Sequence, residues 1–170
     1  RREGIDLGDV DDIASGGGGE MVAQWKNGEG DYFHEQGAFP QQLEHDGAGH
    51  IVASVGEAVG PVAFSSLVCR WDWLSTDDAK RFAAAYRSTR EWVNTADPAE
   101  VARAEASFFP DMAESAIAAA VGFYQKLGTW DGGITVEEDL YTAALDVFEH
   151  SGMVGSRHPY DKVVVPPPGE

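Results

Sequence analysis

One run of polar side chains in this sequence could bind a ligand. Its three consecutive members can donate or accept hydrogen bonds: His34, Glu35 and Gln36. Phe33 and Phe39 flank the run and could supply apolar walls. A buried strand has no need of three consecutive polar residues. We therefore expect the polar part of a small-molecule pocket here, with a surface loop as the alternative.

Other reactive residue types lack the spacing of a catalytic or metal site. The five histidines show no metal-ligand spacing. Cys69 lies in an apolar run and is expected to be a small core residue, and Ser65-Ser66 lacks the glycines of a nucleophile elbow. The glycine run at Ser15–Gly19 has neither phosphate-loop nor dinucleotide spacing, so a plain tight turn or an anion-binding turn both stay open. We therefore expect no enzyme, no cofactor and no metal.

The composition limits the classes of protein to consider. The chain has 170 residues, a net charge of −17 and 43% hydrophobic residues, which is too apolar for a disordered chain. The acidity argues against binding to nucleic acid or to an anionic membrane surface, which need clustered Lys and Arg. No apolar run reaches the roughly 18 residues of a membrane-spanning helix.

The first part of the chain reads as short strands and short helices joined by glycine turns. Four short strands are expected here: Val10–Ala14, Asp31–Glu35, which is rich in aromatic and polar side chains, His50–Val55 and Pro61–Cys69. The last of these is nearly all apolar, as expected of a strand buried on both faces. Short amphipathic helices are expected over Glu20–Asn27 and Pro40–His45. This alternation predicts an α/β fold with a short parallel or mixed sheet.

From Trp71 onward the pattern predicts a helical C-terminal half. Four cap residues each precede an acidic residue by one helical turn: Ser75 with Asp78, Asp97 with Glu100, Asp111 with Glu114, and Thr135 with Glu138. Gly128 and Gly152 stand where helix C-terminal stops belong. Residues 163–170 are expected to form an extended, Pro-rich tail.

The order of these segments carries a family resemblance. Four stretches contribute to it, in chain order: the helix end Trp25–Asp31, the Pro loop Glu35–Pro40, the crossover of His50–Ser54 and Pro61–Cys69, and a helical tail with Phe123–Trp130, Tyr141–Phe148, Ser151–Val154 and His158–Tyr160. Together they resemble the solute-binding proteins of ABC importers, in the class that captures nitrate, alkanesulfonates and thiamine-pyrimidine precursors. The resemblance covers nearly the whole chain but only the back half of a family member. Tyr32 departs from the family, which usually has Ala there.

The resemblance implies part of a two-lobed periplasmic-binding-protein type 2 fold. Residues 1–56 would belong to the second lobe, and residues 57–170 would return to the first lobe and form the C-terminal helices. A hinge would lie at Ser54, Gly56 and Gly60, where glycines absorb changes in backbone dihedrals. The resemblance places six residues in the ligand cleft between the lobes: His34, Glu35, Gln36, Phe39, Phe64 and Ser65.

The function implied by the resemblance is capture of a small molecule by hinge closure. The protein would be periplasmic or extracytoplasmic, with a lipid anchor as one option, and would deliver its ligand to an ABC permease. An unpaired Glu35 would repel an anion, so a pyrimidine-like heterocycle or an amine is the expected ligand. Two alternatives stay open: an enzyme on the same fold, of the pyrimidine-precursor or menaquinone-pathway type, and a ligand-sensing regulatory domain.

The first residues suggest a piece of a longer protein. Arg1–Gly4 reads as the last turn of a helix, although a domain numbered from one fits equally well. If the front half is absent, strand edges would be exposed and would favour self-association.

Overall fold

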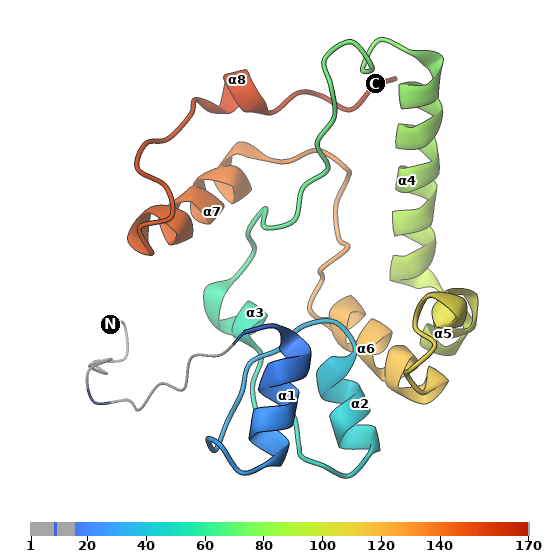
Figure 1. Cartoon of the computed structure of the whole chain (residues 1–170). Helices are drawn as coiled ribbons and strands as arrows, with labels where there is room; N and C mark the ends of the chain where they lie inside the picture. The colour runs from blue at the N-terminus through green and yellow to red at the C-terminus, as the bar shows by residue number, and fades with distance from the viewer. Residues whose placement is uncertain (1–8, 10–15, 170) are drawn as a thin grey trace.

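Every regular element in the part of the chain that the structure describes is helical (Figure 1). A computed structural model describes residue 9 and residues 16–169. The helices follow one another in this order: α1 (Gly18–Lys26), α2 (Phe39–His45), α3 (Val55–Val59), α4 (Asp77–Thr95), α5 (Pro98–Glu105), the 3-10 helix η2 (Ala106–Phe108), α6 (Glu114–Lys126), α7 (Glu138–His150) and α8 (Tyr160–Val163).

The predicted α/β fold with sheet segments, and with it the type 2 periplasmic-binding-protein fold, is therefore wrong for the described residues. The segments 31–35, 50–54 and 61–69 run without helix but form no strand, because none of them lies in register beside another to make a ladder. The segment 61–69 is also exposed rather than buried on both faces: Val68 is 92% exposed and Phe64 64%. The predicted strand Val10–Ala14 lies outside the described residues.

The hydrophobic core lies where α4, α5 and α6 meet (Figure 1). Five buried side chains from the three helices form it: Val93, Val101, Ala102, Ile117 and Val121. Each of the three helices turns apolar residues toward the others, and these residues are buried. Trp92 and Trp130 pack against the cluster and extend it.

The helix boundaries test the capping predictions. Asp97 caps α5 as predicted, because its Oδ1 accepts a hydrogen bond from the Ala99 N–H at 2.8 Å. The cap of α4 is Thr76 rather than Ser75, and its Oγ1 accepts from the Ala79 N–H at 3.1 Å. Helices α6 and α7 begin without a side-chain cap, so Asp111 and Thr135 were wrong as cap predictions.

The predicted helix stops are confirmed. Gly128 follows α6 with φ +69°, and Gly152 follows α7 with φ +76°. Both values lie in the left-handed region, where glycine avoids the steric cost that a Cβ atom would bring.

Helices α7 and α8 lie apart from the core, joined to it by extended segments (Figure 1). Tyr141 of α7 meets Tyr160 of α8 edge to face, with ring centroids 5.7 Å apart. Hydrogen bonds to the carboxylates of Glu149 and Asp146 raise the pKa of Arg157 and tie the chain after α7 back to that helix. The predicted tail began at Val163, but this residue ends α8; the chain after it is not helical and returns to the start of α4.

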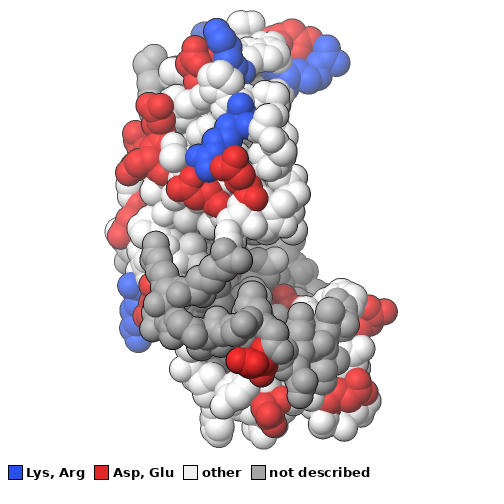
Figure 2. Space-filling model, turned by 90° about the vertical axis from the view of Figure 1, so that its left-hand side faces the viewer, with Lys and Arg blue, Asp and Glu red and all other residues white. Residues whose placement is uncertain are grey.

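The surface reflects the net charge of −17. Figure 2 shows acidic side chains spread over the upper and lower parts of one face, with fewer basic ones among them. In the described part of the chain, no helix combines the length and apolar character needed to cross a membrane.

Two valines test where the core lies. Val101 is fully buried in α5, whereas Val68 is 92% exposed in the segment once expected to be a buried strand. Val101→Ala should lower the free energy of unfolding by about 2 kcal/mol, because it removes buried methyl groups and leaves a cavity. Val68→Ala should change it by less than about 0.5 kcal/mol. Urea denaturation followed by circular dichroism measures both, and a Val68→Ala loss as large as that of Val101→Ala would contradict this core.

Candidate functional site

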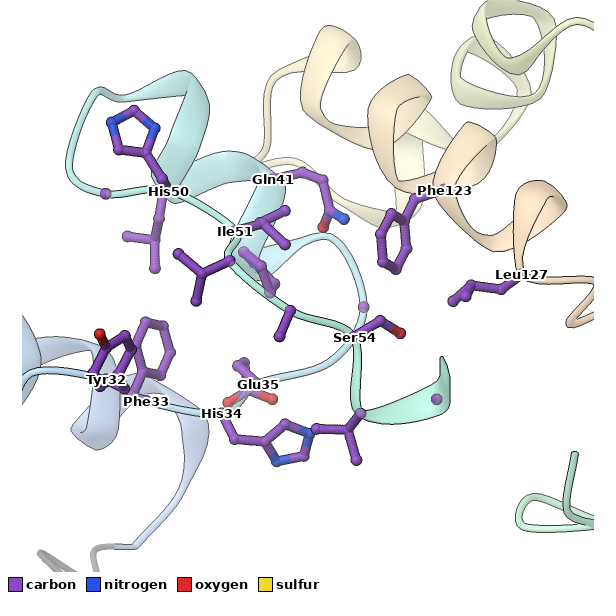
Figure 3. A pocket seen from close by; sticks show the side chains of 18 of the residues that line it. Tyr32, Phe33, His34, Glu35, Gln41, His50, Ile51, Ser54, Phe123 and Leu127 are labelled. Carbon is purple, nitrogen blue, oxygen red and sulfur yellow. The ribbon is translucent and has the colours of Figure 1, made fainter. Parts of the chain in front are cut away.

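A cavity of about 300 Å³ lies between α2, α6 and the two non-helical segments at 31–37 and 49–54 (Figure 3). Helix α2 packs against α6, and this packing holds the two helical walls together. The link between them includes a hydrogen bond from the Ala113 N–H, just before α6, to Oε1 of Gln42 in α2 at 2.7 Å. Helix α6 therefore contributes both to the hydrophobic core and to the wall of the cavity.

Most of the cavity wall is apolar or aromatic. Trp25 of α1 packs against Phe33, with ring centroids 5.1 Å apart. The Trp25 ring can take this position because Gly49 has no side chain: a Cβ atom there would lie 2.3 Å from Cη2 of the indole. The opposite wall comes from the C-terminal end of α6 and includes Phe123 and Leu127 (Figure 3).

Gln41 supplies a buried polar group in this apolar setting. The residue is 7% exposed, and its Oε1 atom has no hydrogen-bond partner. In Figure 3 its side chain lies between Ile51 and Phe123 and points into the cavity. Pro40 stands in the first turn of α2 and places Gln41 directly after it, while the neighbouring Gln42 turns toward α6. A buried amide oxygen without a donor is costly, so a ligand donor that reached this atom would remove that cost.

Glu35 supplies a second such atom. Its Oε1 accepts a hydrogen bond from the Gln36 N–H at 2.9 Å, whereas its Oε2 is buried without a partner. The carboxylate lies against the first turn of α1, where a Cβ atom on Gly18 would be 2.2 Å from Oε2. The positive end of the α1 dipole favours the negative charge there.

The remaining polar residues stand at the exposed edge of the cavity. Asp31, His34 and His50 all line it and are all exposed. The His50 imidazole lies 3.7 Å from the carboxylate of Glu44. Among the described residues that line the cavity there is no Lys or Arg.

The structure brings only part of the predicted cleft together. His34 and Glu35 line the cavity, whereas the neighbouring Gln36 is exposed outside it. Phe39 begins α2 and is 45% exposed, so it forms no wall.

The two first-lobe candidates lie elsewhere. Phe64 stacks on Phe148 of α7, with ring centroids 5.9 Å apart, and Ser65 is exposed next to it. Neither lines the cavity, because the segment 61–69 runs from α3 toward α7 (Figure 1). The ligand-binding roles of all six residues stay predictions.

The predicted hinge residues belong to α3. The Ser54 hydroxyl caps this helix by accepting from the Glu57 N–H at 3.2 Å, and Gly60 ends it with φ +82°. Gly56 lies in its first turn, and both Ser54 and Gly56 line the cavity. The lobe boundary expected near residue 56 falls within this short helix; the hinge and the lobes stay predictions.

Local geometry bears on the glycine run and on Cys69. The glycine run leads into α1, and there the Gly17 N–H donates to Oε2 of Glu20 at 3.1 Å, so a side chain of the chain itself occupies that donor. Cys69 is exposed rather than a core residue. The described residues contain no group of His, Cys, Asp and Glu that could hold a metal ion.

Sequence reasoning missed Gln41, Trp25 and Tyr124. The Tyr124 hydroxyl accepts a hydrogen bond from the Gly37 N–H at 3.0 Å and so fixes the loop between Glu35 and α2. A glutamine directly after the proline of a short helix gives no sign of burial by itself. The spacing of Tyr124 from Ala120 and Val121 is typical of a core face and gives no sign of a cavity.

The Tyr124 contact can be tested by hydrogen exchange. Tyr124→Phe should speed exchange of the Gly37 amide and lower the free energy of unfolding by about 1 kcal/mol, because it removes one hydrogen bond. Tyr141→Phe is the matched control, since it removes a hydroxyl bond to the His158 carbonyl at 2.9 Å. The control should leave exchange at Gly37 unchanged. Equal Gly37 exchange in wild type and Tyr124→Phe would show that the loop is not held this way.

The chain is similar in sequence to a protein that is named as a binding protein. Over 164 residues it is 24% identical to the Bacillus subtilis (strain 168) protein named "Putative binding protein YtlA". The match covers 95% of this chain and 46% of that protein, so the chain spans about half the length of its curated relative. No family model and no solved structure matches the chain.

Proposed function

We propose that this chain binds a small organic molecule in the cavity between α2 and α6, as part of the solute-binding component of an ABC importer. The observation that carries the proposal is the pair of buried oxygens without partners, Oε1 of Gln41 and Oε2 of Glu35. Leaving such groups unpaired costs on the order of 1–3 kcal/mol each. A ligand with hydrogen-bond donors would satisfy both.

The shape and the walls of the cavity support a small ligand. A volume of about 300 Å³ lies at the lower end of the range for small-molecule sites. The rings of Trp25, Phe33 and Phe123 offer flat apolar surfaces, which suit a planar ring.

The relative's name supports only the binding role, and the role in an importer rests on the sequence resemblance. A binding protein of this kind would lie outside the cytoplasm and deliver its ligand to a membrane permease. Movement about residues 54–60 would close the site over the ligand and give affinity by burying it.

The binding site is tested by a pair of glutamine variants. A panel of small organic solutes, including amines and heterocycles, is screened against the purified protein by thermal shift, and hits are titrated by calorimetry. Gln41→Leu should weaken binding of a hit at least tenfold with little change in stability, because leucine fills the same space without an unpaired oxygen. Gln36→Leu, next to Glu35 but outside the cavity, should bind like wild type. No hit in the panel, or equal binding by Gln41→Leu, would contradict the proposed site.

Two further measurements test the wider role. Mass spectrometry of a bound hit after prolonged incubation should recover it unchanged, and conversion to a product would favour an enzyme instead.

Cells that lack the gene should lose uptake of the labelled hit, and the protein should appear in the extracytoplasmic fraction. Unchanged uptake or a cytoplasmic protein would contradict the importer role while leaving the binding site intact.

A further inference from the structure

We infer that the cavity selects an organic cation whose N–H groups bridge Glu35 and Gln41, such as an amidinium or a protonated amine on a planar ring. This inference rests on the proposed function and specifies the charge of its ligand. In the cavity lining, both buried atoms without a partner are oxygens, and a carboxylate oxygen can only accept hydrogen bonds. The complementary ligand therefore presents donors to both.

The charge of the lining favours a positive ligand. Asp31 and Glu35 are acidic, and in the described part of the chain no Lys or Arg lines the cavity. An anion would meet the Glu35 carboxylate without a compensating Lys or Arg. A cation with N–H donors would instead form a charge-assisted hydrogen bond, the stronger kind.

The aromatic walls of the cavity also suit an organic cation. Trp25 and Phe33 form a tilted pair on one side, and Phe123 lies on the other. Ring faces carry partial negative charge and attract cations placed over them. A flat cation between these walls would use the rings as well as the oxygens.

The position of Glu35 depends on Gly18. The carboxylate lies against this residue, and a Cβ atom there would come within 2.2 Å of Oε2. Alanine at position 18 would therefore push the carboxylate out of place. The next residue in α1, Gly19, has no atom within 4 Å of the corresponding position. Alanine at either position should support the helix about equally.

Three probes of matched shape test the inference: benzamidine, a cation; benzamide, which is neutral; and benzoate, an anion. Calorimetry at neutral pH and low salt should show benzamidine binding at least tenfold more tightly than benzamide, and benzoate not binding. Glu35→Gln should remove most of this preference. Glu57→Gln is the control, because it removes the same charge outside the cavity and should keep the preference for benzamidine. The comparison shows whether the preference comes from contact with Glu35 or from the overall charge of −17.

The glycine pair provides a second, independent test. Gly18→Ala should weaken benzamidine binding at least tenfold, whereas Gly19→Ala should bind like wild type, with melting temperatures confirming that both fold. Equal benzamidine binding by the two glycine variants would overturn the inference.

The probe results also separate this inference from the proposed function. Benzamide or benzoate bound as tightly as benzamidine, with binding lost in Gln41→Leu, would overturn the cation preference and leave the binding site standing. If none of the three probes binds, the cation inference fails, and the solute panel decides the proposed function separately.

Discussion

Helix α6 connects the stability of this protein to its candidate site. One face of the helix places Ile117 and Val121 in the core against α5, and its C-terminal end places Phe123 and Leu127 in the cavity wall. Since the core fixes α6, the wall is fixed as well. Helix α2 is then held on α6, and it carries Gln41 into the cavity. The site is rigid on this side and is completed on the other by two segments without regular structure.

One of those two segments carries Glu35, the source of one of the two unpaired oxygens in the site. Backbone groups in a regular element find partners within the element, whereas groups on an irregular segment need partners from elsewhere. Glu35 finds one partner in the adjacent Gln36 N–H and leaves its other oxygen open. The Tyr124 hydroxyl holds the loop that follows, so the carboxylate stays next to the first turn of α1.

The helical half was predictable because its signals are local. Asp97 before Pro98 specified the start of α5, and Gly128 and Gly152 specified two ends, since each depends only on neighbouring residues. The strands were wrong because a strand depends on a partner in register, which residues 61–69 do not have in the described structure. For the site, the polar run pointed to His34 and Glu35, but burial of Gln41 depends on the packing of α2 on α6, which no local pattern reveals.

A ligand in the cavity should contact the side chain of Gln41. Nuclear magnetic resonance of the side-chain amides reports this contact directly, with the Gln41 signals assigned by their loss in Gln41→Leu. We expect the Gln41 amide signals to shift as a bound solute from the screen is titrated in, while those of the exposed Gln36 stay in place. Shifts confined to other parts of the molecule, with the Gln41 signals unmoved at saturation, would contradict it.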